Sequence, residues 1–287
     1  MAQSKYFSHR ATVFFVVFIL LVLYVPALII VAQDNSRPAG TREKLSVGEL
    51  FIPDNLQLND GKANLVVHLH GTPERSERNL AKSTWSAAAI TVSLNGLSGV
   101  YTRQFTPPDV FLQLVDEAAA KIAAHFKQPS IKFKRVAMTS FSAGFGGVRQ
   151  LLKSDECYQR IDDLVMADSI YAGYSEPASE RKVDPELMAG FLRFARDAVA
   201  GRKTLVISNC QLQPDGYAST GETADYLIRE LGLSRQPEQK EWAPSWHCAS
   251  RCEQGRLHIF GFDGTEGADH MRHLLNLGDL LKIAVKQ

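Results

Sequence analysis

The sequence predicts an α/β fold in which a mostly parallel central sheet carries helices on both faces and follows an N-terminal hydrophobic helix. Two patterns predict the sheet and its helices. After about residue 46, short apolar runs of strand length alternate with longer runs of helical periodicity. The 287 residues are 45% apolar and 22% charged, a composition sufficient for one large core. The uncharged run over residues 11–32 predicts the hydrophobic helix.

The elements follow in a regular order. A first strand over residues 48–52 is expected at an antiparallel edge of the sheet. Short apolar runs predict buried strands over residues 65–70, 89–94, 134–139, 163–167, 204–208 and 256–262. Helical periodicity predicts helices over residues 77–86, 109–126, 148–153, 185–200, 222–231 and 271–285. Two longer connections remain, residues 171–184 and a polar loop over residues 234–254 with Trp242 and Trp246, and we expect them above the functional site.

Residues 11–32 follow Lys5 and Arg10 and predict a targeting segment. The run is longer than the roughly 7 to 15 apolar residues of a signal-peptide core and approaches the roughly 20 that span a bilayer. Length favours an uncleaved membrane anchor, whereas residues 30–32 form a passable signal-peptide cleavage site. Residues 1–32 are therefore a signal peptide or signal anchor, and residues 33–45 are a polar linker. The folded domain, residues 46–287, is expected outside the cytoplasm, either membrane-anchored or secreted or periplasmic.

The charge balance excludes one class of function. The net charge is +1, and no run of Lys and Arg interleaves with aromatic residues. A nucleic-acid-binding protein needs a basic surface to neutralise phosphates. We therefore expect no nucleic-acid partner.

A serine in a turn of small residues is the most informative motif. Ser142 lies in the sequence Ser-Phe-Ser-Ala-Gly, between the strand predicted over residues 134–139 and the helix predicted over residues 148–153. A sharp strand-to-helix turn lifts a serine hydroxyl clear of the backbone and places it beside N–H donors. Such a turn requires small flanking residues, and these are Ser140 and Gly144.

This motif, with the order of elements around it, resembles the α/β-hydrolase superfamily, and in particular its serine esterases and lipases. The nucleophile turn of that superfamily reads Gly-x-Ser-x-Gly, and this chain departs from it at Ser140. The resemblance covers most of the chain after about residue 46. It implies a Ser-acid-His triad in that chain order, an acyl-enzyme intermediate and no cofactor.

His270 is the candidate base, because it follows the last predicted strand in a glycine-rich loop and functional groups collect at the carboxyl ends of parallel strands. His273 is its nearest rival, one helical turn further along, and His258 and His125 are expected to be structural.

Two residues are candidates for the acid of the triad. Asp168 ends the strand over residues 163–167 and is favoured, since a residue fixed at a strand end orients an imidazole more rigidly than one within a loop. Asp215, after the next strand, is the alternative.

The oxyanion hole is expected from two backbone N–H groups. One belongs to Ala143, the residue after the nucleophile, and the other to Thr72, in the loop after the strand over residues 65–70. Gly71 would let that loop approach a substrate closely. Pro73 has no N–H group and cannot contribute.

Other site types fit less well. The pair His68 and His70 lies on one face of a strand, but the Asp-His that would continue a metallo-hydrolase motif is replaced by Gly-Thr-Pro-Glu, so no metal is expected. Nucleotide binding is a second alternative, suggested by Gly144-Phe145-Gly146-Gly147 at a helix start. Arg149 stands where the dinucleotide fingerprint needs its third glycine.

In an exported chain the four cysteines, Cys157, Cys210, Cys248 and Cys252, allow one or two disulfides. For the pair Cys248 and Cys252 the expectation is a local disulfide or two unpaired thiols.

Together the motifs predict an exported or membrane-anchored serine hydrolase with Ser142, Asp168 and His270 as its triad. Its substrate would be a small-molecule or lipid-like carboxylic ester, and residues 11–32 would contact the membrane if they remain uncleaved. A peptidase or amidase on the same fold and a catalytically silent hydrolase-like binding domain are the alternatives.

Overall fold

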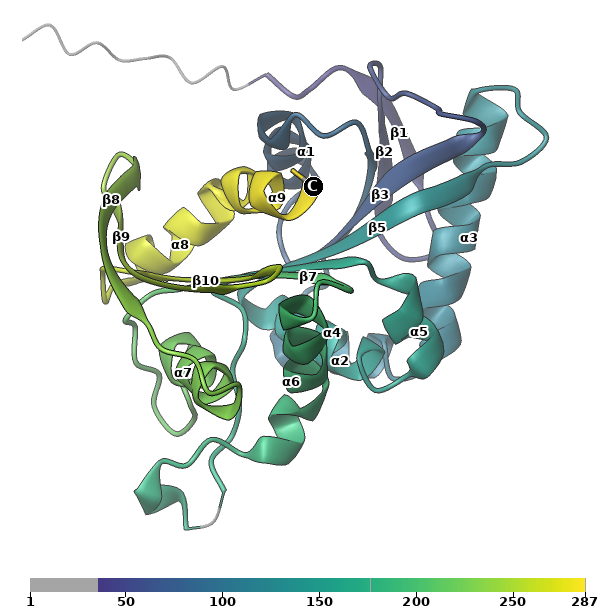
Figure 1. Ribbon diagram of the computed structural model, residues 1–287. Helices are drawn as coiled ribbons and strands as arrows, with labels where there is room; N and C mark the ends of the chain where they lie inside the picture. Colours follow the sequence, from purple (N-terminus) through teal and green to yellow (C-terminus); the bar gives the residue numbers. More distant parts are fainter. Residues whose placement is uncertain (1–35, 176, 287) are drawn as a thin grey trace, which may run out of the picture. The chain divides into compact units, whose positions relative to one another are not determined.

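The computed structural model describes residues 36–175 and 177–286, which contain one ten-stranded sheet with helices on both faces (Figure 1). The strands are β1 Gly40–Lys44, β2 Glu49–Pro53, β3 Lys62–Leu69, β4 Ala88–Val92, β5 Lys132–Phe141, β6 Asp163–Ala167, β7 Thr204–Asn209, β8 Gln236–Ala243, β9 Trp246–Gln254 and β10 Leu257–Phe262. The helices are α1 Pro73–Ser83, α2 Ser98–Gln104, α3 Pro108–His125, α4 Phe145–Leu151, α5 Asp155–Arg160, α6 Pro185–Val199, α7 Thr220–Glu230, α8 Gly267–Leu275 and α9 Leu277–Val285. Short 3-10 turns, η1 Ser142–Gly144 and η2 Ala178–Glu180, complete the set.

The centre of the sheet is parallel. The strand order is β1-β2-β4-β3-β5-β6-β7-β10-β9-β8. The strands from β4 to β10 in this order run parallel, whereas β1 and β2 on one side and β9 and β8 on the other run antiparallel. The predicted mostly parallel α/β sheet is confirmed.

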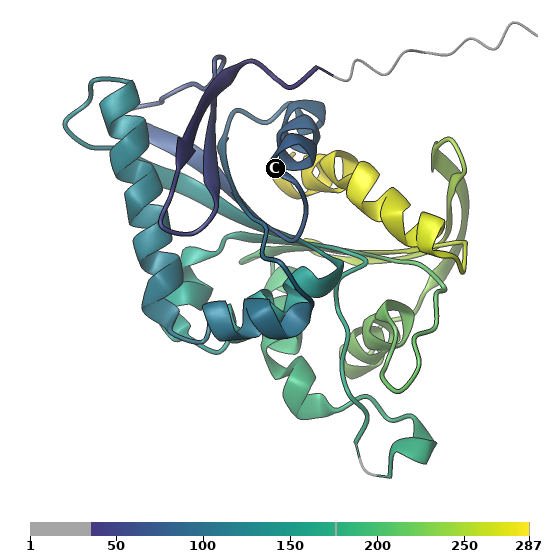
Figure 2. The ribbon, with the colours of Figure 1, turned by 180° about the vertical axis from the view of Figure 1, so that it is seen from behind.

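Helices divide between the two faces of the sheet (Figures 1 and 2). Helices α1, α8 and α9 pack on one face, and α2 to α7 lie on the other. Strand β6 shows why the central strands are apolar throughout: Leu164 and Met166 enter one core, and Val165 and Ala167 enter the other. The carboxyl ends of the parallel strands meet at one edge, where loops from many parts of the chain converge.

Local sequence signals set several helix starts. The Thr72 hydroxyl accepts a hydrogen bond from the Arg75 N–H, and Pro73 occupies the first turn, so α1 begins several residues before its predicted start at residue 77. Ser219 and Glu222 form a capping box at the start of α7. Such caps satisfy N–H groups that have no acceptor within the helix.

The prediction of a polar loop over residues 234–254 is wrong. These residues form the antiparallel strands β8 and β9, and β9 pairs with β10 and extends the sheet. Trp246 is buried and stacks on Phe262 with ring centroids 3.9 Å apart. The segment is therefore part of the sheet, and its strands are polar because one of their faces meets solvent.

Two smaller predictions also need correction. The segment 33–45, expected to be a linker, contains β1, which pairs with β2 and forms the edge that we had assigned to residues 48–52. The single helix expected over residues 271–285 is two helices, α8 and α9, separated at Asn276. The short helix α2 was not predicted.

The hydrophobic run over residues 11–32 lies outside the described residues. Within residues 36–175 and 177–286, no helix combines the length and the apolar composition that crossing a bilayer demands.

Candidate active site

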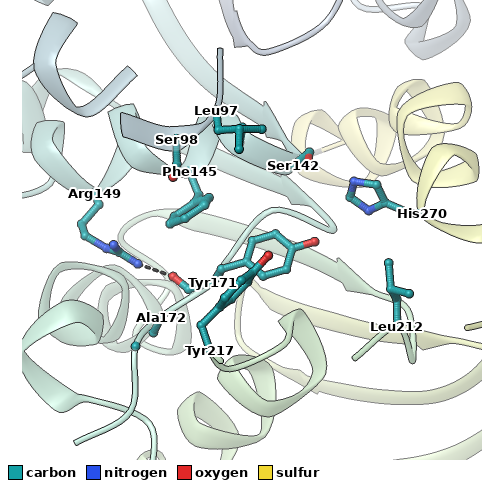
Figure 3. Close-up of a pocket in the computed structure, with 12 residues that line it drawn as sticks. Leu97, Ser98, Ser142, Phe145, Arg149, Tyr171, Ala172, Leu212, Tyr217 and His270 are labelled. Carbon is teal, nitrogen blue, oxygen red and sulfur yellow. Dashed lines mark hydrogen bonds between the residues drawn. The ribbon is translucent and has the colours of Figure 1, made fainter. Parts of the chain in front are cut away.

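The candidate site is a cavity of about 460 Å³ at the carboxyl edge of the parallel strands (Figure 3). Ser142 and His270 both line it, one from the turn after β5 and the other from α8. The rest of its wall comes from the start of α2 at residues 97–98, from η1 and α4 at residues 143–149, and from the loops after β6 and β7. The expectation that residues 171–184 contribute to the wall is confirmed for the first part of that segment, and residues 234–254 do not line this cavity.

The turn at Ser142 holds the predicted nucleophile in an unusual conformation. Strand β5 ends at Phe141, and Ser142 adopts a φ of 45°, a left-handed value that non-glycine residues seldom take. The chain then enters η1 and α4. A Cβ atom added to Gly144 would lie 2.5 Å from the Leu69 carbonyl oxygen and 2.6 Å from the Ser140 hydroxyl, so no larger residue fits at this position.

Ser140, which replaces the glycine of the superfamily motif, is fully buried in this turn. Its hydroxyl is 2.7 Å from the hydroxyl of Ser169, and the Ser169 hydroxyl donates to the Ser142 carbonyl at 2.9 Å. The extra hydroxyl therefore has a partner and connects the turn to the end of β6. This arrangement explains how the chain tolerates serine at that position.

Asp168 and His270 are brought together. Asp168 follows β6, is fully buried, and adopts a φ of 46°. Its Oδ2 is 2.6 Å from Nδ1 of His270. Asp215 is exposed in the loop after β7, and the structure does not bring it to His270.

Several other donors hold the Asp168 carboxylate. Its Oδ1 accepts from the Cys210 N–H at 3.0 Å and from the Thr220 hydroxyl, and its Oδ2 accepts from the Cys210 thiol at 2.8 Å. Burial alone would raise the pKa of Asp168, but His273, His270 and the Cys210 thiol favour the carboxylate and hold that pKa well below its usual range. The group is therefore ionised at neutral pH and can orient His270.

An aromatic stack supports the His270 ring. The ring lies on Phe141, with centroids 4.5 Å apart and planes inclined by 28°. On its other side Phe141 stacks on His70, whose Nδ1 is 3.1 Å from the Tyr101 hydroxyl. Burial and the neighbouring His270 lower the pKa of His70. His70 is thus a neutral member of the loop that precedes Thr72.

The two residues predicted for the oxyanion hole lie at the starts of helices. Ala143 is the second residue of η1, and Thr72 is the residue that caps α1. The first N–H groups of a helix have no acceptor within it, so both positions offer donors to an oxyanion. Gly71, between His70 and Thr72, is tightly enclosed, since an added Cβ would lie 2.7 Å from Nε2 of His68.

The remaining histidines have other surroundings. His273 is buried one turn along α8, and its Nδ1 is 2.7 Å from the Ser208 hydroxyl. His68 is buried in β3 with Nδ1 2.8 Å from the Thr139 hydroxyl. His258 contacts Glu253 on β9, and His125 is exposed at the end of α3. These positions agree with structural roles for His258 and His125.

Among the described residues, one buried group could offer three metal ligands, namely Asp168, Cys210 and His273. The Asp168 oxygens already accept from four donors. Burial raises the pKa of the Cys210 thiol, which disfavours the thiolate that metals bind. The donor set therefore fits a hydrogen-bonded carboxylate better than a metal.

All four cysteines are free and buried. The local disulfide that we considered between Cys248 and Cys252 does not form. A register shift where β9 pairs with β10 lies between them, and Cys248 enters one core while Cys252 enters the other. Thiols on opposite faces of a strand cannot reach each other.

Sequence reasoning missed several residues of the site. Cys210, just after β7, and Thr220, on α7, contact Asp168, and Arg149 and Tyr217 line the cavity. Cys210 directly follows a parallel strand, so its position at the site edge could have been read from the strand pattern. The others arrive through packing of separate connections, which leaves no mark in the sequence.

Comparisons with known proteins agree with this architecture. No protein-family model and no curated protein matches the sequence. Among solved structures, ferric enterobactin esterase from Salmonella typhimurium matches with a TM-score of 0.50 and 12% identity over 88% of this chain and 58% of its own length. A siderophore hydrolase from Aspergillus nidulans matches with a TM-score of 0.48 and 14% identity over 87% of this chain and 95% of its own. The chain thus has the α/β-hydrolase fold, which the sequence resemblance predicted, and it spans less than two thirds of the first of these proteins.

Proposed function

We propose that this protein is a serine hydrolase that cleaves small carboxylic esters with Ser142, His270 and Asp168. One observation carries the proposal. A serine in a left-handed turn after a central strand lines the same cavity as a histidine, and that histidine contacts a buried carboxylate at 2.6 Å. A nucleophile, a base and a group that orients the base define the triad logic of acyl transfer.

The reaction would proceed in two halves. The Ser142 hydroxyl attacks the ester carbonyl while Nε2 of His270 takes its proton, and the N–H groups of Ala143 and Thr72 stabilise the resulting oxyanion. His270 then returns the proton to the departing alcohol, which leaves an acyl group on Ser142. Water, deprotonated by His270, attacks the acyl-enzyme and releases the acid and the free serine. The ferric enterobactin esterase with a similar fold supports an ester as the substrate, at the level of chemical class.

Labelling with a fluorophosphonate probe tests the nucleophile, because the probe requires an activated serine and no particular substrate. We expect the wild-type protein to be labelled and to hydrolyse short aryl esters, and Ser142→Ala to lose both properties while its melting temperature is preserved. Ser234→Ala, at an exposed serine in the connection between α7 and β8, is the matched control and should behave as wild type. Undiminished ester hydrolysis by Ser142→Ala would exclude Ser142 as the nucleophile.

We further propose that residues 11–32 carry the chain to a membrane and keep the catalytic domain outside the cytoplasm. The support is the length of an uncharged run that follows Lys5 and Arg10. Expressed full-length protein should stay with membranes after high-salt and carbonate washing. A mature product that begins at Gln33 would indicate a cleaved signal peptide, and full-length protein in the cytoplasm would contradict export.

A further inference from the structure

One charged side chain stands apart in the cavity beside Ser142. Arg149 extends from α4 into its wall, and among the described residues that line this cavity it is the one with a permanent charge. Its neighbours there are mostly apolar or aromatic: Leu97, Ala143, Phe145, Tyr171, Ala172, Leu212 and Tyr217. Figure 3 shows the rings of Phe145, Tyr171 and Tyr217 between Arg149 and His270.

The guanidinium of Arg149 has few partners. Its Nη2 donates to the Tyr171 carbonyl, and its Nε is buried without an acceptor. Within residues 36–175 and 177–286, no carboxylate forms an ion pair with it, although Asp184 attracts it from further away. Burial lowers the pKa of Arg149 to about 10, which still leaves it protonated at neutral pH. A partly buried positive charge without a counter-charge is costly unless something else compensates for it.

Aromatic rings pack on and around the guanidinium of Arg149. Phe145 covers one face of the guanidinium, with the Arg149 Cζ 4.8 Å from the ring centroid. Tyr171 packs on Phe145 with centroids 5.4 Å apart, and Tyr217 packs on Tyr171 at 5.7 Å. A guanidinium stacked on an aromatic face still presents N–H donors in its plane, a geometry that fits a carboxylate. The rings themselves offer surfaces on which a flat aromatic group can pack.

We propose that the cavity selects esters that carry both an aromatic group and an anionic group such as a carboxylate, with Arg149 as the residue that binds the anion. This inference rests on the proposed ester hydrolysis and adds the substrate class. The aromatic group packs among Phe145, Tyr171 and Tyr217, the ester carbonyl lies at Ser142, and the anion supplies the counter-charge that the guanidinium lacks. Arg149 is thus a specificity-determining residue that touches the substrate away from the reacting atoms.

A structural role for Arg149 makes a different prediction. Its bond to the Tyr171 carbonyl could serve to position the loop after β6, in which case its removal would reduce the hydrolysis of all esters alike. A binding role changes the preference between an anionic ester and its neutral analogue. The ratio of the two rates therefore separates the roles.

The experiment compares two pairs of esters at neutral pH. In one pair the anion is on the alcohol side, with 4-carboxyphenyl acetate against its methyl ester, 4-(methoxycarbonyl)phenyl acetate. In the other pair it is on the acyl side, with 4-nitrophenyl hydrogen terephthalate against its methyl ester. We expect the wild type to prefer the anionic member of at least one pair by roughly tenfold to a hundredfold in kcat/KM, mainly through KM, as one charge-assisted contact provides.

Substitutions then assign the preference. Arg149→Met, which removes the charge and keeps an unbranched side chain, should abolish the preference, and Arg149→Lys should retain part of it because the charge stays while the fork is lost. Arg193→Met is the matched control, since Arg193 also stacks on an aromatic ring, Tyr158, at 3.8 Å but lies on α6 outside the cavity. It should leave the preference unchanged.

The outcomes distinguish this inference from the proposed function. If the neutral esters are hydrolysed through Ser142 and neither pair shows an anionic preference, the inference is wrong and the proposed function stands. Equal loss on both members of a pair in Arg149→Met would make Arg149 structural and would also overturn the inference. If Ser142→Ala hydrolyses esters at the wild-type rate, the proposed function fails and this inference fails with it.

Discussion

Three residues of the candidate site share a strained backbone. His70, Ser142 and Asp168 each follow the last residue of a parallel strand, and their φ angles are 70°, 45° and 46°. A non-glycine residue in this region costs about 1 to 3 kcal/mol, and such strain persists where surrounding contacts over-determine the conformation. The hydroxyls of Ser140 and Ser169 hold the turn at Ser142. Four donors hold the carboxylate of Asp168.

The surroundings of Asp168 lead to a prediction about the acid of the triad. Asp168→Asn should lower kcat by about 10⁴-fold, because an amide in place of the carboxylate would favour the wrong tautomer of His270. Asp215→Asn should change kcat by less than about threefold, since an exposed loop carboxylate stabilises little. Steady-state rates on a short aryl ester, with both variants checked for an unchanged melting temperature, measure the difference.

The reverse ranking of the two variants would identify Asp215 as the acid. It would also require the loop after β7 to rearrange, because Asp215 is exposed and Asp168 contacts His270. Thr220→Val offers a graded control. It removes one donor from the carboxylate and leaves the contact with His270, so its effect should lie between those of the two asparagine variants.

At the scale of elements, the predictable strands are those buried on both faces. β3, β5, β6, β7 and β10 are short apolar runs, and their order along the chain determined which loops would meet at one edge. That order, together with the serine motif, placed Ser142, Asp168 and His270 at one edge of the sheet, and it left Asp215 as an alternative acid. The contact between Asp168 and His270 joins residues 102 apart in sequence.

The antiparallel strands were not predictable in the same way. β8 is exposed or half-buried along its whole length, so it lacks both an apolar run and a clean alternation. β9 buries Trp246, Cys248 and Cys252, but small or polar residues separate them, so β9 contains no apolar run of strand length. These polar strands form by pairing with a neighbour, β8 with β9 and β9 with β10, and β10 is specified by its own apolar sequence.

The cavity wall was also beyond prediction from single elements. Arg149 lies on a helix, Tyr171 after β6 and Tyr217 after β7, and only packing brings the three together. The same holds for the donors to Asp168, of which Thr220 belongs to α7. The sequence thus predicts which residues can do chemistry at a strand end, whereas the shape of the pocket depends on tertiary contacts.

At the scale of the whole molecule, two buried histidines lie on the face of the sheet covered by α1, α8 and α9. His273 contacts the rings of Trp246 and Phe262, and His68 lies beside Gly71, which also approaches Leu274. In each histidine, Nδ1 is within hydrogen-bond distance of a hydroxyl group, whereas Nε2 is buried and has no hydrogen-bond partner. Protonation would therefore place a charge in an apolar layer without an acceptor for the new N–H group.

This arrangement predicts how stability depends on pH. Burial lowers the pKa of His68 to about 4, an effect to which His70 adds, and burial lowers that of His273 to about 4 as well, with Asp168 opposing the shift. In the unfolded chain both would titrate near 6.5. Between these values the unfolded state binds more protons, so the free energy of unfolding falls as the pH decreases from about 6.5 to 4. Each histidine contributes a loss on the order of 3 kcal/mol over that window.

Urea denaturation at a series of pH values between 7 and 4 measures the effect. His68→Gln and His273→Gln should each be less stable than wild type at pH 7 and lose less stability on acidification, since glutamine does not titrate. His125→Gln, at an exposed position on α3, should keep the wild-type slope. Burial raises the pKa of Asp163, so its titration changes the free energy of unfolding in the opposite direction to the histidines, in wild type and in every variant. The test therefore compares the slope of each variant with that of wild type. Identical slopes in wild type, His68→Gln and His273→Gln would show that neither histidine is held neutral by the fold.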